Sequence, residues 1–167
     1  DGTLIVVSRD LTRAVRATAI APTLQRALED WSNAAPRLNA LSDALNDGSA
    51  EDAFALDVAA LAAPLPRAYE FVDGSAYLPH VERVRRARGA EVPESFYVDP
   101  LMYQATSAGF LGPHDPVKVV DEAYGIDLEA EIVVITDDVP MAVSPERAAT
   151  HIQLVGLVND VSLRNLI

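Results

Sequence analysis

The sequence predicts an α+β protein, with a small α/β N-terminal domain over residues 1–65 and a mainly β part over residues 66–167. Three observations support this fold class. Half of the 167 residues are hydrophobic, which is enough to build a sizeable core. Apolar residues recur with helical spacing in the first part, whereas short strand-like runs between long loops dominate the second. Residues 62–66 contain two prolines, which favour an extended linker between the two parts.

The first part is predicted to fold as a strand followed by two helices. Residues 4–7 form a short apolar run with β-branched side chains, which is typical of a strand. Helical spacing then places four apolar residues on one face: Leu24, Ala27, Leu28 and Trp31. We expect residues 33–36 to interrupt this helix, and a second helix to end near Gly48. Residues 53–58 alternate weakly and form a further candidate strand.

The second part is predicted to contain two helices among several strands. The helices are expected at 77–88 and 145–149, and the strands at 69–72, 117–120, 128–136 and 152–159. Residues 92–116 are expected to be irregular. The last six residues, 162–167, look like the start of a helix without an end.

The charge balance and the amino-acid composition exclude several classes of protein. The chain has 25 acidic and 13 basic residues, a formal net charge of −12. Nucleic acids and anionic membranes attract clustered Lys and Arg, so neither is an expected partner. The chain has no cysteine, and hence no disulfide framework or thiolate site. Because no long apolar segment or signal peptide is recognisable, we expect a cytoplasmic protein.

Two glutamates lead into a strongly apolar strand. Glu129 and Glu131 are two residues apart, so in a strand they share a face at a spacing of roughly 7 Å. Like charges at this distance repel unless water or a cation screens them. The residues are therefore either the solvated face of an edge strand or part of a cation site. The following run, 132–135, is apolar at every position and is expected to be buried on both faces.

A third carboxylate, Asp160, closes the second long apolar strand. A charged group at the end of a buried strand must be paired, hydrogen-bonded or bound to a metal. The alternative is an Asp that caps the following turn or helix, from Ser162 onward. With the two glutamates, Asp160 would complete an all-oxygen site. Such a ligand set suits Mg²⁺, Mn²⁺ or Ca²⁺ better than zinc.

A strand–turn–helix junction at residues 73–80 carries the best-placed histidine. Asp73 follows a predicted strand, and His80 lies in the first turns of the next helix. His80 is either a general base or a surface histidine beside charged neighbours. Arginines at positions 83, 85, 86 and 88 form a short basic patch, which is either a solvated helix face or an anion contact.

Four sequence blocks resemble the fumarylacetoacetate hydrolase family. They are YEFVDGSAYLPHV at 69–81, PLMYQ at 100–104, GIDLEAE at 125–131 and VNDVSLR at 158–164. The most specific element is E-x-E followed by N-D-x-S-x-R. The resemblance covers residues 66–167, and it implies a distorted β-roll and a homodimer. It also implies that the second domain is incomplete, truncated after Ile167.

The resemblance also implies roles for individual residues. A divalent ion, Mg²⁺ or Ca²⁺ with Mn²⁺ as a further option, would be held by Asp73, Glu129, Glu131 and Asp160. His80 matches the family's water-activating histidine. The substrate would be contacted by Ser75, Tyr103 and Arg164. Ser75 stands where relatives carry Tyr or Arg, and Arg164 is alternatively a helix-surface cation.

The implied reaction is hydrolysis of a carbon–carbon bond in a β-diketo acid, such as an acylpyruvate, in the catabolism of aromatic compounds. His80 would activate water while the metal ion stabilises the developing enolate. The expected partner is therefore a small oxo-acid. Two alternatives stay open. One is decarboxylation, isomerisation or hydration of oxo- or dienoic acids on the same metal site, and the other is an inactive fragment or cation-binding module.

Overall fold

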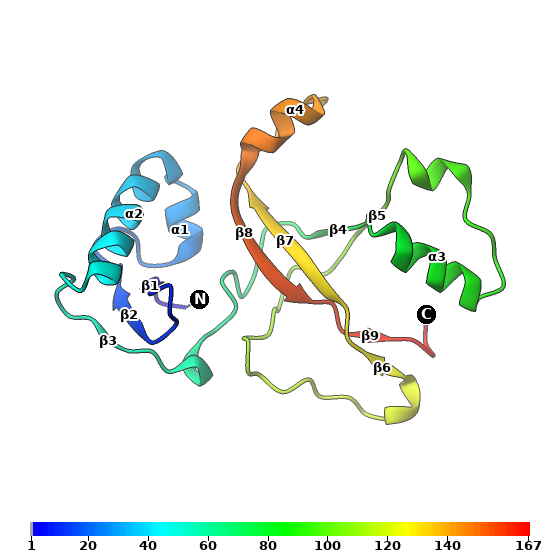
Figure 1. Ribbon diagram of the computed structural model, residues 1–167, viewed down its shortest axis with the longest axis horizontal. Coiled ribbons are helices and arrows are strands. Elements are labelled where there is room, and N and C mark those ends of the chain that lie inside the picture. The colour runs from blue at the N-terminus through cyan, green and yellow to red at the C-terminus, as the bar shows by residue number, and fades with distance from the viewer. Residues whose placement is uncertain (1) are drawn as a thin grey trace. The chain divides into compact units, whose positions relative to one another are not determined.

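The structure, a computed structural model, describes residues 2–167 as a mixed α/β chain with small sheets (Figure 1). It divides into two compact units. One comprises Asp57–Asp115 with Gly2, and the other comprises Thr3–Leu56 and Pro116–Ile167. Within residues 2–167, no helix combines the length and the apolar character that crossing a membrane requires.

The N-terminal segment is a three-stranded antiparallel sheet with two helices. Its strands are β1 (Ile5–Val7), β2 (Arg13–Arg16) and β3 (Phe54–Ala55), in the order β1-β2-β3. The helices are α1 (Leu24–Leu28) and α2 (Trp31–Asp47). The core consists of small buried residues with partly buried larger ones around them: Leu4, Ala17, Ala21, Ala27 and Ala34, with Val6, Ile20, Leu24, Trp31, Leu38 and Leu41.

The break between the first two helices differs from the prediction. Helix α2 runs through Pro36 instead of stopping there, and the chain turns earlier, at the N-cap Asp30. The Asp30 carboxylate accepts a 2.7 Å hydrogen bond from the Asn33 side-chain amide, and the Asp30 carbonyl accepts from the Ala34 amide. The predicted end is confirmed, because Gly48 caps α2 with a left-handed φ of 86°.

The turn between β1 and β2 is organised by one carboxylate. Asp10 Oδ1 accepts hydrogen bonds from the Ser8 hydroxyl at 2.5 Å and from the Thr12 hydroxyl and amide at 2.8 and 3.1 Å. These bonds, with that of Ser8 contributing most, lower the pKa of Asp10 from 3.8 to about 2. The ionised form is therefore the one that the folded chain favours.

The lowered pKa of Asp10 predicts a pH-dependent stability. Because the folded pKa is below the unfolded one, the stabilisation is complete above about pH 4 to 5 and is lost as the pH falls towards 2. We expect Asp10→Asn to melt below the unmodified chain at pH 7, and the two melting temperatures to converge near pH 2. Thermal melts of both chains between pH 2 and pH 7 test this pH dependence. A constant difference at all pH values would contradict the role of the charge.

The unit Asp57–Asp115 contains one strand pair and one α-helix. Strands β4 (Val72–Ser75) and β5 (Leu101–Gln104) are antiparallel, and α3 (Leu78–Ala87) follows β4. The predicted helix at 77–88 is thus confirmed within one residue at each end. The strand predicted at 69–72 instead begins at Val72. The region 92–116, predicted to be irregular, contains β5 and a 3₁₀ turn at Glu94–Tyr97.

The C-terminal segment contains two antiparallel pairs in one continuous register. Strand β6 (Ile126–Asp127) pairs with β9 (Ser162–Leu163), and β7 (Ala130–Thr136) pairs with β8 (Ile152–Asn159). Helix α4 (Pro145–Ala148) lies between β7 and β8 in the chain and confirms the predicted short helix.

Two predictions for this segment are wrong. Residues 117–120 form no strand. Residues 162–167 do not start a helix, because Ser162 and Leu163 pair with β6 instead. The Asn165 side chain also donates to the Ala123 carbonyl at 2.8 Å. Gly125, at a left-handed φ of 72°, permits this close approach, since a Cβ there would lie 3.0 Å from Asn165 Nδ2.

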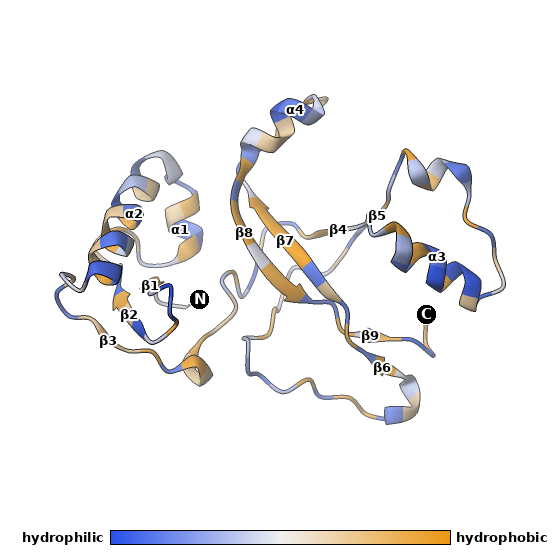
Figure 2. Ribbon diagram, viewed as in Figure 1, coloured by the Kyte–Doolittle hydropathy of each residue, from blue (hydrophilic) through white to orange (hydrophobic). Residues whose placement is uncertain are grey.

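The β7–β8 ribbon is apolar but not buried on both faces as predicted. Figure 2 shows the hydrophobic residues concentrated along both strands. In β7, exposed residues such as Ile132 and Val134 alternate with half-buried ones. Their register partners Leu157 and Val155 are exposed as well, Leu157 by 83%. The apolar run therefore reflects a ribbon with one open face.

Candidate functional site

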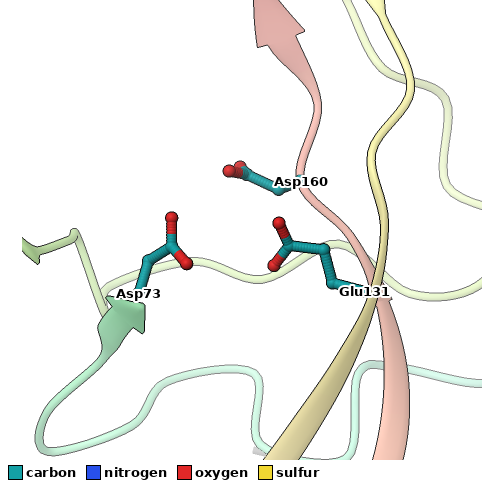
Figure 3. Close-up of side chains that lie close together, drawn as sticks. All are labelled: Asp73, Glu131 and Asp160. Atoms are coloured by element: carbon teal, nitrogen blue, oxygen red, sulfur yellow. The ribbon is translucent and has the colours of Figure 1, made fainter. Parts of the chain in front are cut away.

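Two of the predicted metal ligands lie together at one end of the β7–β8 ribbon. Glu131 is the second residue of β7, and Asp160 directly follows β8. Glu131 is paired with Val158, and Asp160 comes two residues after Val158, so both carboxylates point to the same face. A carboxylate oxygen of each lies within 4.8 Å of one of the other (Figure 3).

The donor set of this pair fits a hard divalent cation. Ligand bonds of about 2.0–2.6 Å to one ion can span the separation of the two oxygens. Both residues are half-buried, so water still solvates part of each carboxylate. A bound ion would replace only some of that water. Carboxylate oxygens favour Mg²⁺, Ca²⁺ or Mn²⁺ over zinc. No helix follows Asp160, so the helix-capping form of the alternative is wrong.

Glu129 lies next to this pair along the chain and is held by the segment that follows β8. Its carbonyl accepts a 2.9 Å hydrogen bond from the Asp160 amide, and its amide donates to Asn159 Oδ1 at 3.2 Å. Its Oε1 accepts from the Ser162 hydroxyl at 3.2 Å and forms an ion pair with Arg164. The side chain of Glu129 is only 12% exposed, so these partners replace most of its water.

Arg164 bridges two acidic residues of the opposite strand. Its Nε donates to Asp127 Oδ2 at 2.9 Å, and its Nη2 donates to Glu129. The hydrogen bond with Asp127 and then the bond and charge of Glu129 raise the pKa of Arg164, against the opposing effect of burial. Arg164 directly follows β9 and lies in a turn, so the alternative of a helix-surface cation is wrong.

The other predicted site residues belong to the unit Asp57–Asp115. Asp73, also labelled in Figure 3, is the second residue of β4 and lies opposite Tyr103 of β5. Residues opposite each other in an antiparallel pair, and residues two apart in one strand, share a face. Asp73, Ser75 and Tyr103 therefore project from the same face of this strand pair. The unit brings together one predicted metal ligand and two predicted substrate contacts.

His80 lies in the first turn of α3, five residues after Ser75. Its amide donates to the Tyr77 carbonyl at 2.9 Å, and Pro79 occupies an early position in the helix, where a missing amide hydrogen costs little. His80 is half-buried, whereas His114 is exposed in a loop. The third histidine, His151, contacts Asp137 Oδ1 through its Nδ1 at 2.5 Å.

Sequence reasoning missed two polar residues of this region, Asp127 and Ser162. Asp127 lies two residues before Glu129, as Glu129 does before Glu131. The alternation that linked the two glutamates therefore includes Asp127 as well. Ser162 stands two residues after Asp160 and is paired with Asp127. A search of the opposite strand for alternating polar residues would have found both.

The structure is that of a mixed α/β protein with acidic residues that could hold a cation, an arrangement also found in metal-dependent hydrolases and lyases. Two family models match consecutive parts of the chain. Residues 1–67 match the fumarylacetoacetase N-terminal domain 2, and residues 70–167 match the fumarylacetoacetate (FAA) hydrolase C-terminal domain. The chain therefore belongs to the fumarylacetoacetate hydrolase family, which confirms the resemblance. None of the curated proteins matches the chain.

Proposed function

We propose that this chain forms the metal-dependent site of a hydrolase that cleaves a carbon–carbon bond in a β-diketo acid. The observation that carries the proposal is the Glu131–Asp160 pair, two carboxylates turned to one face at the ends of paired strands. Membership of the FAA hydrolase family supports a hydrolase- or lyase-like activity in general. The β-diketo acid and the bond cleaved are the parts that experiment must decide.

Four carboxylates are proposed to hold the ion: Asp73, Glu129, Glu131 and Asp160. Glu131 and Asp160 supply oxygens at a separation that suits a common ion. Asp73 comes from a different unit, and its participation rests on the family resemblance. A divalent ion bound there would supply Lewis acidity towards a substrate oxygen.

The proposed proton acceptor is His80. A neutral imidazole has a nitrogen lone pair that can take a proton from water. The short turn from β4 to α3 separates His80 from Asp73 and Ser75 by only a few residues. This closeness in the chain favours a site in which the three act on one substrate.

Ser75 and Tyr103 are proposed to orient the substrate. Both project from the face of the β4–β5 pair that also carries Asp73. A serine and a tyrosine hydroxyl can each donate a hydrogen bond to a carboxylate or keto oxygen. A small oxo-acid with several such oxygens would match this set of donors.

Product analysis with acylpyruvates tests the proposed reaction. With Mg²⁺ or Mn²⁺ present we expect two carboxylate fragments, and with excess chelator we expect the turnover to be lost. Release of carbon dioxide would instead identify a decarboxylase on the same site. Binding of the ion without turnover of any oxo-acid would identify a cation-binding module and contradict the proposed hydrolase.

A further inference from the structure

We infer that Phe96 and Tyr97 are positioning residues that hold helix α3, and with it His80, in place. They are the last two residues of the 3₁₀ turn Glu94–Tyr97, and we call them the aromatic clamp. The inference rests on the proposed function, because it requires His80 to act as the proton acceptor. Both clamp residues lie outside the sequence blocks that carry the family resemblance.

Helix α3 has little apolar packing of its own. The structure describes all ten of its residues, and among these only Val81 is buried. Isolated helices of this length are marginal in water, and most helices in proteins depend on tertiary contacts for their stability. Contacts made by the half-buried side chains of α3 therefore bear strongly on where His80 lies.

The aromatic clamp supplies two such contacts. The guanidinium carbon of Arg85 lies 4.9 Å from the centre of the Phe96 ring, which is a cation–π contact. The Tyr97 hydroxyl donates a hydrogen bond to Glu82 Oε1 at 3.3 Å. Burial, and then the charge and the hydrogen bond of Glu82, raise the pKa of Tyr97, so the phenol keeps its proton at neutral pH. Glu82 and Arg85 are three residues apart, so the two contacts fall on one side of α3.

This side of α3 is turned away from His80. At about 100° per residue, Glu82 lies about 200° around the helix from His80, and Arg85 lies about 140° from it. The clamp can therefore hold the helix without covering the imidazole. A contact on the histidine side would compete with water and substrate for the same space.

The clamp also connects α3 to the strand pair that carries other proposed site residues. Its own backbone is fixed, because the Phe96 amide donates to the Pro93 carbonyl at 3.0 Å. The chain then continues within a few residues into β5, where Tyr103 lies opposite Asp73 of β4. The proposed proton acceptor is thus tied to the same strand pair from two directions, by the turn after β4 and by the clamp before β5.

Amide hydrogen exchange of α3 tests the clamp without any substrate. Phe96→Leu removes the ring face, and we expect α3 to exchange about 2- to 5-fold faster, the weight of one exposed cation–π contact. Phe96→Tyr keeps the ring and should restore the exchange rate. Phe110→Leu is the matched control, because Phe110 is a half-buried ring of the same unit that packs on Phe71 instead of on α3.

Kinetics show whether the clamp acts through His80. We expect Phe96→Leu to lower kcat for acylpyruvates about 10-fold, within the roughly 10²-fold that a displacement of 1 Å can cost. Mn²⁺ affinity should not change, since neither clamp residue is a proposed ligand. Added to His80→Ala, Phe96→Leu should lower kcat by less than about twofold more, because the group that it positions is already gone. Phe96→Tyr should keep most of the kcat.

Several outcomes would overturn the inference. Unchanged α3 exchange in a Phe96→Leu variant whose far-UV circular dichroism is normal would do so, as would equal kcat losses from Phe96→Leu with and without His80. If the unmodified chain is active and Phe96→Leu has a normal kcat, only the positioning role is wrong. If the unmodified chain turns over no oxo-acid, the proposed function is wrong and the inference falls with it.

Discussion

Glu131→Gln is expected to reduce Mn²⁺ affinity by more than about 100-fold, beyond the 10- to 100-fold that loss of an outer-shell partner costs. The substitution removes one negative charge and replaces a carboxylate oxygen with a poorer ligand, at almost constant shape. Asp160→Asn should have the same effect, because the two carboxylates lie within reach of one ion. Isothermal titration of the chain with Mn²⁺ measures both losses.

Glu122→Gln is the matched control for the metal-site variants. Glu122 is exposed in the 3₁₀ turn Glu122–Tyr124 of the same unit, so its replacement removes the same charge away from the proposed site. We expect it to change Mn²⁺ affinity by less than about twofold, because exposed charges are well screened. Equal losses for Glu122→Gln and Glu131→Gln would show that the net charge attracts the ion without a defined site.

His80→Ala is expected to reduce kcat for acylpyruvate hydrolysis by about 10²- to 10⁴-fold, the usual contribution of a general base. The alanine variant can no longer accept a proton from water at this position. Mn²⁺ affinity should stay the same, since His80 is not a proposed ligand. Steady-state kinetics with a parallel metal titration separate the two effects.

His114→Ala serves as the control for the kinetic experiment. It removes a histidine of the same unit from an exposed loop and should leave kcat unchanged. A His80→Ala variant with normal kcat, or one that loses Mn²⁺ binding together with turnover, would contradict the assigned role.

Much of the secondary structure follows from local sequence. The apolar strands around residues 130–136 and 152–159 and the helix after Tyr77 were predicted because their patterns need no distant partner. The errors have two causes. Residues 33–36 were expected to interrupt a helix, but the chain turns earlier, at Asp30, and α2 runs through Pro36. Ser162 was expected to begin a helix, but pairing with β6 determines its conformation.

The candidate site was predictable to a similar extent. Alternation in a strand and position at a strand end single out Glu129, Glu131 and Asp160, and the structure brings Glu131 and Asp160 together. The partners of Arg164 were not predictable, because they depend on the register between two segments far apart in sequence. The β-roll, the homodimer and the substrate contacts stay predictions of the family resemblance.

The central proposal is that Glu131 and Asp160 hold a divalent ion, with Asp73 as a further ligand that the family resemblance implies. A Mn²⁺ titration of the unmodified chain and of Asp73→Asn, with Asp99→Asn as an exposed control from the same unit, tests it most directly. We predict one tight site per chain, weakened at least about 10-fold by Asp73→Asn and unchanged by Asp99→Asn. Equal affinity of the unmodified chain and a folded Asp73→Asn variant would contradict the claim.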